Sequence, residues 1–407
     1  MNLVKQLFLK PIFDNWSHPR FGFIHDQRLP TTTRRTDEEK KAFDREMNRV
    51  DKWLKMLKEQ PKWFPRGSRN HEKMVERVWK GVPERMRGSL WRILLDLDQI
   101  KAEQEGKYQE MRELARRHSP DIRQIDLDVN RTYRNHIMFR ERYNTRQQDL
   151  FHVLGAYSIY NAEVGYCQGM SQIAALLLMY LNDDEDAFWA LSQLMVGRRW
   201  NMHGFFIPGF PKLIRFQEHH DKILMKKLRR LQKHLIANGV DTGIYTLKWF
   251  FQCFLDRMPY SLTIRVWDLY LLEGEPIMFA MAYTILKLHR KALLKMGMDE
   301  LLEFLQKTME TDFGFDDDYV IETALKESLA ELRSSRLHTA GPPPDNEKPQ
   351  KPFGLHRSDN FDTRFYFHSN TIFTTASLLL KRRHPRQGET QSHAAKSSSL
   401  RFADGFQ

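Results

Sequence analysis

Apolar residues recur at three- and four-residue steps along most of the chain between Pro83 and Leu337, as one face of an α-helix requires. No run of alternating apolar and polar residues indicates a strand, and no internal repeat indicates a solenoid. The pattern therefore predicts an all-α fold, either as one large domain or as two packed helical lobes. The predicted helices cover residues 87–97, 148–160, 171–181, 184–196, 212–237, 246–255, 262–272, 276–295 and 298–309.

The pattern changes at both ends of the chain. Residues 1–36 are expected to be partly irregular, and a charged helix is predicted over residues 37–60. We expect this helix to pack on the rest of the protein, because one of its faces carries large apolar side chains. These are Phe43, Met47, Val50, Trp53, Leu54 and Leu57.

After Leu337 the composition is typical of a flexible tail, so the helical domain is predicted to span residues 37–337. The tail, residues 338–407, begins with the proline-rich segment Gly341–Pro352 and ends in a basic, serine-rich stretch with little to bury. Pro342–Pro352 is a candidate polyproline ligand for an SH3 domain, and the alternative is a plain solvated linker.

Composition narrows the classes of partner. The 407 residues include 64 Lys+Arg and 52 Asp+Glu, for a net charge of +12, and 41% hydrophobic residues are enough to build a core. A basic protein can meet nucleic acid, an anionic membrane or an acidic protein. Acidic clusters such as Asp183–Asp186 interrupt the basic residues, so we expect no nucleic-acid partner.

The sequence also indicates where the protein works. The longest apolar run, Ile173–Leu181, is about half of the roughly 20 residues of a membrane-spanning helix. We therefore expect peripheral membrane association at most. Only Cys167 and Cys253 are present, which is typical of a reducing compartment and a cytoplasmic protein.

Common enzyme templates are missing from the sequence. There is no Gly-x-x-x-x-Gly-Lys-Ser/Thr phosphate loop, no His-Glu-x-x-His and no paired Cys-x-x-Cys. The pair His219-His220 is interpreted as ordinary surface or core histidine. The sequence thus predicts neither a cofactor nor a metal of the protein's own.

Three short segments carry candidate chemistry. Arg87 and Trp91 lie four residues apart on one predicted helix face. Asp128 and Arg131 lie three apart, so the carboxylate can hold the guanidinium in one direction. Gln168 follows Tyr166-Cys167 between two glycines, which allow a tight turn that presents a side chain outward. Taken singly, each segment also has an ordinary structural explanation.

Taken together, in this order and spacing, the segments resemble the TBC domain, the fold of GTPase-activating proteins for Rab GTPases. The resemblance covers residues 78–310, with details similar to the RN-tre (ubiquitin-specific-protease N-terminal-like) subgroup in residues 119–126, 158–161 and 249–257. The matching motifs are Arg-x-x-x-Trp at Arg87 and Trp91, Ile-x-x-Asp-x-x-Arg at Ile125, Asp128 and Arg131, Tyr-Cys-Gln at Tyr166, Cys167 and Gln168, and the stretch Arg265–Gly274.

The resemblance implies a two-lobed helical domain that accelerates GTP hydrolysis by a Rab and so regulates vesicle traffic at endosomal, Golgi or plasma membranes. It makes Arg131 an arginine finger and Gln168 a glutamine finger, both supplied in trans. It makes Asp128 the residue that orients Arg131. Arg87, Trp91 and Tyr166 would shape the surrounding groove, and Cys167 would mark the loop beside it. GTP and Mg²⁺ would come with the Rab; the rival is an adaptor that binds Rab without catalysis.

Overall fold

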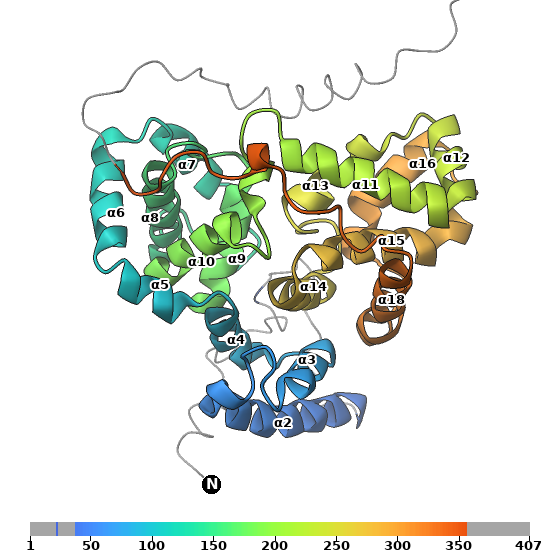
Figure 1. Ribbon diagram of the computed structural model, residues 1–407, viewed down its shortest axis with the longest axis horizontal. Coiled ribbons are helices and arrows are strands. Elements are labelled where there is room, and N and C mark those ends of the chain that lie inside the picture. The colour runs from blue at the N-terminus through green and yellow to red at the C-terminus, as the bar shows by residue number, and fades with distance from the viewer. Residues whose placement is uncertain (1–21, 23–36, 356–407) are drawn as a thin grey trace, which may run out of the picture. The chain divides into compact units, whose positions relative to one another are not determined.

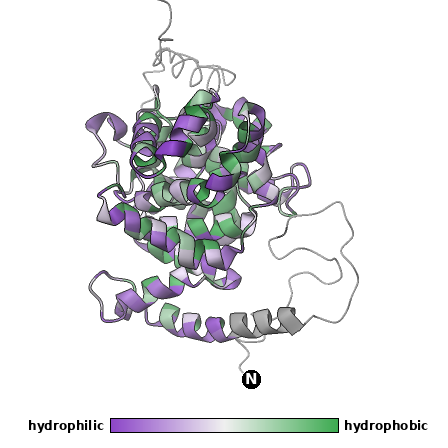
Figure 2. Ribbon diagram, turned by 90° about the vertical axis from the view of Figure 1, so that its right-hand side faces the viewer, coloured by the Kyte–Doolittle hydropathy of each residue, from purple (hydrophilic) through white to green (hydrophobic). Residues whose placement is uncertain are grey.

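The computed structural model describes residue 22 and residues 37–355, with side chains from residue 48 onward. Every regular element in this part of the chain is helical, so the predicted all-α class is confirmed. None of the described helices is long and apolar enough to cross a membrane. Figure 2 shows hydrophilic residues along the outer turns and hydrophobic residues toward the interior of the helical unit.

A first lobe is built around α8 and α9 (Figure 1). Helix α8 packs against α6, α7, α9 and α10. Helix α9 is apolar on nearly every side, and such a helix has to be buried on all sides. The helices of this lobe are α4 (Arg87–Leu94), α5 (Leu97–Glu103), α6 (Lys107–His118), α7 (Ile122–Val129), α8 (Thr145–Tyr160), α9 (Met170–Leu181) and α10 (Asp184–Val196).

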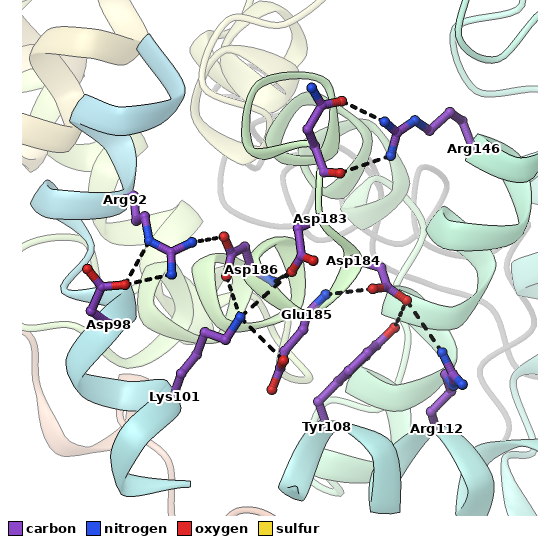
Figure 3. Close-up of polar contacts among 11 residues, drawn as sticks. Arg92, Asp98, Lys101, Tyr108, Arg112, Arg146, Asp183, Asp184, Glu185 and Asp186 are labelled. Carbon is purple, nitrogen blue, oxygen red and sulfur yellow. Dashed lines mark hydrogen bonds and ion pairs between the residues drawn. The ribbon is translucent and has the colours of Figure 1, made fainter. Parts of the chain in front are cut away.

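The acidic run at the start of α10 forms the polar cluster of Figure 3. Negatively charged side chains stabilise a helix N-terminus, because the free backbone N–H groups there carry partial positive charge. Asp186 is also paired with Arg92 and, at 2.8 Å, with Lys101 Nζ. Tyr108 Oη donates to Asp184 Oδ2 at 2.6 Å. This cluster therefore ties α4, α5 and α6 to the start of α10.

A second lobe follows, in which α11 packs on α13 and α14 packs on α15. Helix α14 also contacts α4 and α3, so it connects the two lobes and the N-terminal helices. The helices of this lobe are α11 (Pro211–Lys227), α12 (Arg229–Ala237), α13 (Thr242–Phe251), α14 (Tyr260–Glu273), α15 (Glu275–Leu293), α16 (Met298–Glu303), α17 (Met309–Thr311) and α18 (Lys326–Ser334), with π-helical turns at Phe304–Thr308 and Tyr319–Leu325.

The N-terminal helix α2 (Asp37–Lys58) lies near α3 (His71–Trp79) in Figure 1. The prediction that it packs on the protein is confirmed for its second half, because Trp53 and Met56 are buried. The side chains of Phe43 and Met47 lie outside the described residues.

Two of the predicted helices are in fact interrupted. The helix predicted over residues 212–237 breaks at Leu228, whose φ and ψ of −131° and 40° are not helical. The helix predicted over residues 87–97 ends at Leu94, and Asp96 has a left-handed φ of 52°. No proline or glycine marks either break, and the Leu228 side chain is buried, so packing overrides helical periodicity there.

Residues 338–355 differ from the expected solvated linker. Glu347 is fully buried and accepts hydrogen bonds from Arg215 Nε at 2.6 Å and Nη2 at 2.8 Å. The Phe353 ring stacks on Tyr160 at 5.4 Å between centroids, and the Gly354 N–H donates to the Tyr160 carbonyl at 2.8 Å. A bidentate ion pair and an aromatic stack hold this proline-rich segment on the domain. Predictions for residues 1–21, 23–36 and 356–407 fall outside the described residues.

Candidate functional site

A buried carboxylate joins two of the three sequence motifs. Asp128 is 1% exposed in the last turn of α7. Its Oδ1 lies 2.6 Å from Arg131 Nη2 and accepts a hydrogen bond from Gln124 Nε2 at 2.9 Å. Its Oδ2 accepts a hydrogen bond from Tyr166 Oη at 2.6 Å. One side chain therefore fixes both Arg131 and the loop that begins at Tyr166.

Arg131 lies just beyond the end of α7, where its N–H donates to the Asp128 carbonyl at 3.2 Å. Its side chain is 56% exposed, in contrast to the buried carboxylate that holds it. A guanidinium carries five N–H donors. Arg131 can therefore keep its contact with Asp128 and still offer donors to an anionic group outside the protein.

Gln168 lies in a tight turn immediately before α9. The flanking Gly165 and Gly169 have φ angles of 62° and 105°, which side-chain-bearing residues rarely adopt. A Cβ on Gly169 would lie 2.9 Å from the Phe251 ring, so α13 packs closely against this turn. The Gln168 side chain is half-buried, and its amide has no hydrogen-bond partner in the described part of the chain. The amide is therefore able to make a further hydrogen bond.

Tyr166 and Cys167 both remain neutral. Burial, followed by the charge of Asp128, raises the pKa of Tyr166 far above its usual value, so Tyr166 stays a hydrogen-bond donor. Burial, followed by the charges of Asp121 and Asp128, raises the pKa of the Cys167 thiol to about 12. A thiol of that pKa is unreactive near neutral pH, so Cys167 supports the loop by packing.

Arg87 and Trp91 meet a different carboxylate. Arg87 Nε donates to Asp268 Oδ1 at 3.0 Å and Trp91 Nε1 to the same oxygen at 2.8 Å, and all three side chains are buried. Arg87 also pairs with Glu84. These contacts join α4 of the first lobe to α14 of the second. The role of Arg87 and Trp91 in shaping the groove stays a prediction.

Sequence reasoning missed several residues of the site. Gln124 lies one helical turn before Asp128, so helical spacing alone could have suggested their contact. Asp121 Oδ2 accepts from the Tyr166 N–H at 3.0 Å across 45 residues, and no local pattern indicates that contact. The pKa of Lys248 on α13 is lowered mainly because the side chain is buried. The positive charges of Arg257 and, to a smaller extent, Arg131 lower this pKa further.

One group of potential metal ligands lies elsewhere in the first lobe. Side-chain atoms of Asp149, His152 and Asp184 come within 4.8 Å of one another. Arg146 Nη1 lies 3.2 Å from Asp149, and Arg112 Nη1 lies 3.6 Å from Asp184. Since arginines already compensate both carboxylates, the arrangement is better explained as an ion-pair cluster.

Residues 84–294, more than half of the chain, match the RabGAP-TBC family, described as the Rab-GTPase-TBC domain. The chain therefore belongs to this family. The matched region contains all three motifs, the carboxylate of Asp128 and the connecting helix α14.

Similar proteins agree with this membership. The mouse protein named TBC1 domain family member 10B is 31% identical over 274 residues, which are 64% of this chain and 33% of that protein. The chain thus spans about a third of that relative's length. The crystal structure of the Chlamydomonas flagellar RabGAP TBC domain has a TM-score of 0.61 and 26% identity, over 76% of this chain and 98% of that one. The crystal structure of the Ypt/Rab-GAP domain of Gyp1p shares the fold, with a TM-score of 0.58 and 19% identity, over 71% of this chain and 99% of that one.

Proposed function

We propose that this chain is a GTPase-activating protein for a Rab-family small GTPase. Membership of the Rab-GTPase-TBC family supports the class. The observation that carries the proposal is the pair of 2.6 Å contacts through which Asp128 holds Arg131 and Tyr166. They fix two features to the same carboxylate: an exposed arginine, and the loop of a glutamine whose side-chain amide has no hydrogen-bond partner among the described residues.

The proposed chemistry is electrostatic. In GTP hydrolysis, negative charge spreads over the oxygens of the transferred phosphoryl group while a water attacks in line. Arg131 supplies its guanidinium to those oxygens, and Gln168 supplies its amide to orient the water. The nucleotide and Mg²⁺ belong to the Rab, and this chain contributes no cofactor. An arginine supplied in trans accelerates such a reaction roughly 10³- to 10⁵-fold.

The test is single-turnover GTP hydrolysis by a panel of purified, GTP-loaded Rabs. We expect Arg131→Ala and Arg131→Lys to lower the stimulated rate at least about a hundredfold for the Rab that the wild type activates. Lysine keeps the charge but loses the planar set of donors. Gln168→Ala should also lower the rate strongly. Arg117→Ala, an exposed arginine on α6, is the matched control and should change nothing.

A second measurement separates activation from mere binding. A Rab that lacks its own active-site glutamine should still be partly stimulated, since Gln168 replaces that side chain. The rival function is a helical adaptor that binds the Rab without catalysis. Wild-type rates in both finger variants, with unchanged Rab binding, would favour the adaptor and refute the catalytic proposal.

The finer assignments are also proposals. The motif details of residues 119–126 and 249–257 support an RN-tre-like subgroup and a role in endosomal or Golgi traffic. We propose a cytoplasmic protein recruited peripherally to such membranes. Pro342–Pro352 remains a proposed SH3 ligand, with the condition that the segment leaves the domain, since Glu347 within it is buried against Arg215.

A further inference from the structure

A pocket of about 320 Å³ lies where α11, α12 and the end of α15 meet. Leucine side chains line part of it, and all its other lining residues are cationic. We call these residues the basic pocket: Lys227, Arg229, Arg230, Arg290 and Lys291. The volume lies at the lower end of the range of small-molecule sites, about 300–1,000 Å³. No carboxylate lines the pocket, although acidic residues interrupt the basic ones elsewhere in the sequence.

The break at Leu228 creates this arrangement. The Leu228 side chain is buried, and the chain changes direction there between α11 and α12. Arg229 and Arg230 open the new helix and lie beside Arg290 and Lys291 from the last turn of α15. Four exposed cations from two separate helices thus line one pocket, where an external anion could contact several of them at once.

These four side chains have no ion-pair partner within residues 48–355. Lys227, the fifth, is paired with Glu331 Oε1 at 3.3 Å. Two less exposed cations of the same lobe differ, because each has an acidic partner. Arg215 pairs with Glu347, and the fully buried Lys212 pairs with Glu275. These four cations are therefore available to an external anion.

The surface around the pocket is also unusual. Lys226 and Lys233 continue the positive charge along the exposed side of α11 and α12. Three large apolar side chains are exposed on the same helices and at the start of α16: Met225 is 54% exposed, Ile236 67% and Met298 48%. His234 Nε2 lies 3.0 Å from the Met296 carbonyl, which brings the start of α16 beside α12.

We propose that the basic pocket binds the phosphorylated headgroups of anionic lipids, with Met225 and Ile236 entering the membrane interface. Lysine and arginine together with exposed aliphatic side chains are typical of surfaces that lie on anionic bilayers. Single-stranded nucleic acid would instead require aromatic residues for base stacking, and no aromatic residue lines the pocket. The inference goes beyond the proposed GTPase activation and does not depend on it.

The location agrees with such a role. In Figure 1, α12 and α16 lie at the opposite end of the helical unit from α6 and α7. A membrane bound there would lie away from α6 and α7. Binding of this surface to an anionic membrane would also be favoured by the protein's net charge of +12.

The experiment is co-sedimentation of the full chain with vesicles of phosphatidylcholine alone, or with added phosphatidylserine and phosphatidylinositol bisphosphate. We expect binding only to the anionic vesicles. The double variant Arg229→Glu/Arg230→Glu should weaken it about thirtyfold or more, since each basic residue near an anionic surface contributes about fivefold. The matched control is Arg116→Glu/Arg117→Glu, two adjacent exposed arginines on α6, which gives the same change in net charge.

The outcomes are distinct. Wild-type vesicle binding in the pocket variant, or an equal loss in the α6 control, would overturn the assignment of this surface. Soluble inositol trisphosphate should compete with the vesicles for the pocket. If the protein binds this compound but no vesicles, the proposal of a membrane surface is refuted, and the ligand of the pocket is a soluble phosphate compound. GTP hydrolysis by a soluble Rab is measured in parallel and should be unchanged in both variants. If no Rab is activated by the wild type, the proposed function fails while the vesicle result still decides the lipid surface.

Discussion

Replacing the carboxylate of Asp128 tests whether this residue fixes the direction of Arg131. Asp128→Asn keeps the size of the side chain but removes its charge and turns one acceptor atom into a donor. Three hydrogen-bond donors face the native carboxylate: Gln124 Nε2 at 2.9 Å, Arg131 Nη2 at 2.6 Å and Tyr166 Oη at 2.6 Å. The amide can satisfy at most part of this set.

The magnitude follows from these contacts. A hydrogen bond to a charged group contributes about 1.5–3 kcal/mol, against about 0.5–1.5 kcal/mol for a neutral one. Each of the two buried bonds thus loses about 1 kcal/mol, and the contact with the half-exposed Arg131 loses less because water screens it. We expect the free energy of unfolding to fall by about 2 kcal/mol. Looser positioning of Arg131 should lower kcat about tenfold to thirtyfold, less than its removal does.

The assay compares Asp128→Asn with Gln124→Leu, in stimulated GTP hydrolysis and in urea unfolding. Gln124→Leu removes a donor to the same carboxylate but leaves its contacts with Arg131 and Tyr166. It should therefore cost stability, about 1–3 kcal/mol, while kcat stays close to the wild-type value. Equal kcat values for the two variants, at equal stability, would refute a positioning role for Asp128.

Two further predictions concern the loop and the pH dependence of stability. Gly169→Ala should lower both stability and kcat, because φ is 105° and the new Cβ would meet the Phe251 ring. The control is Gly67→Ala, where φ is also positive, at 81°, but the space around the new Cβ is open. Gly67→Ala should lower stability alone. Burial, followed by the neighbouring His219, lowers the pKa of His220 to about 3, so between about pH 6.5 and 3 the unfolded chain binds a proton that the folded chain does not. The contribution of neutral His220 to the free energy of unfolding is therefore fully present above about pH 6.5. On acidification the free energy of unfolding falls by up to about 1.4 kcal/mol per pH unit. His220→Gln should flatten this dependence in urea titrations. A slope unchanged by His220→Gln would show that other groups set the acid sensitivity.

Local features of this protein could be read from its sequence. Helix α10 occupies the predicted residues 184–196, and α9, α14 and α15 lie within one or two residues of their predictions, because each is rich in apolar residues along its length. Helices α3, α6, α7 and α18 were missed, since they are short or carry mostly charged residues between few buried ones. The spacing of Asp128 and Arg131 on one helical turn also indicated their contact correctly.

Long-range contacts could not be read in the same way. Tyr166 reaches Asp128 across 38 residues, and Arg87 reaches Asp268 across 181. The motifs did not indicate which carboxylate each residue binds: Arg87 binds Asp268, and Tyr166 binds Asp128. The packing of Glu347 on the domain was missed as well, because the composition around it is typical of a linker.

The sequence by itself determined the all-α class, most of the long helices and the family, because these depend on apolar spacing and on short motifs of consecutive residues. The tertiary structure alone decided which carboxylate holds which arginine and that α11 ends at Lys227, just before Leu228. It also decided which cations of the basic pocket have no ion-pair partner among the described residues. A buried polar group needs a partner, but any distant segment can supply it. Spacing along the chain therefore indicates that such a partner is needed, and only the fold determines which residue supplies it.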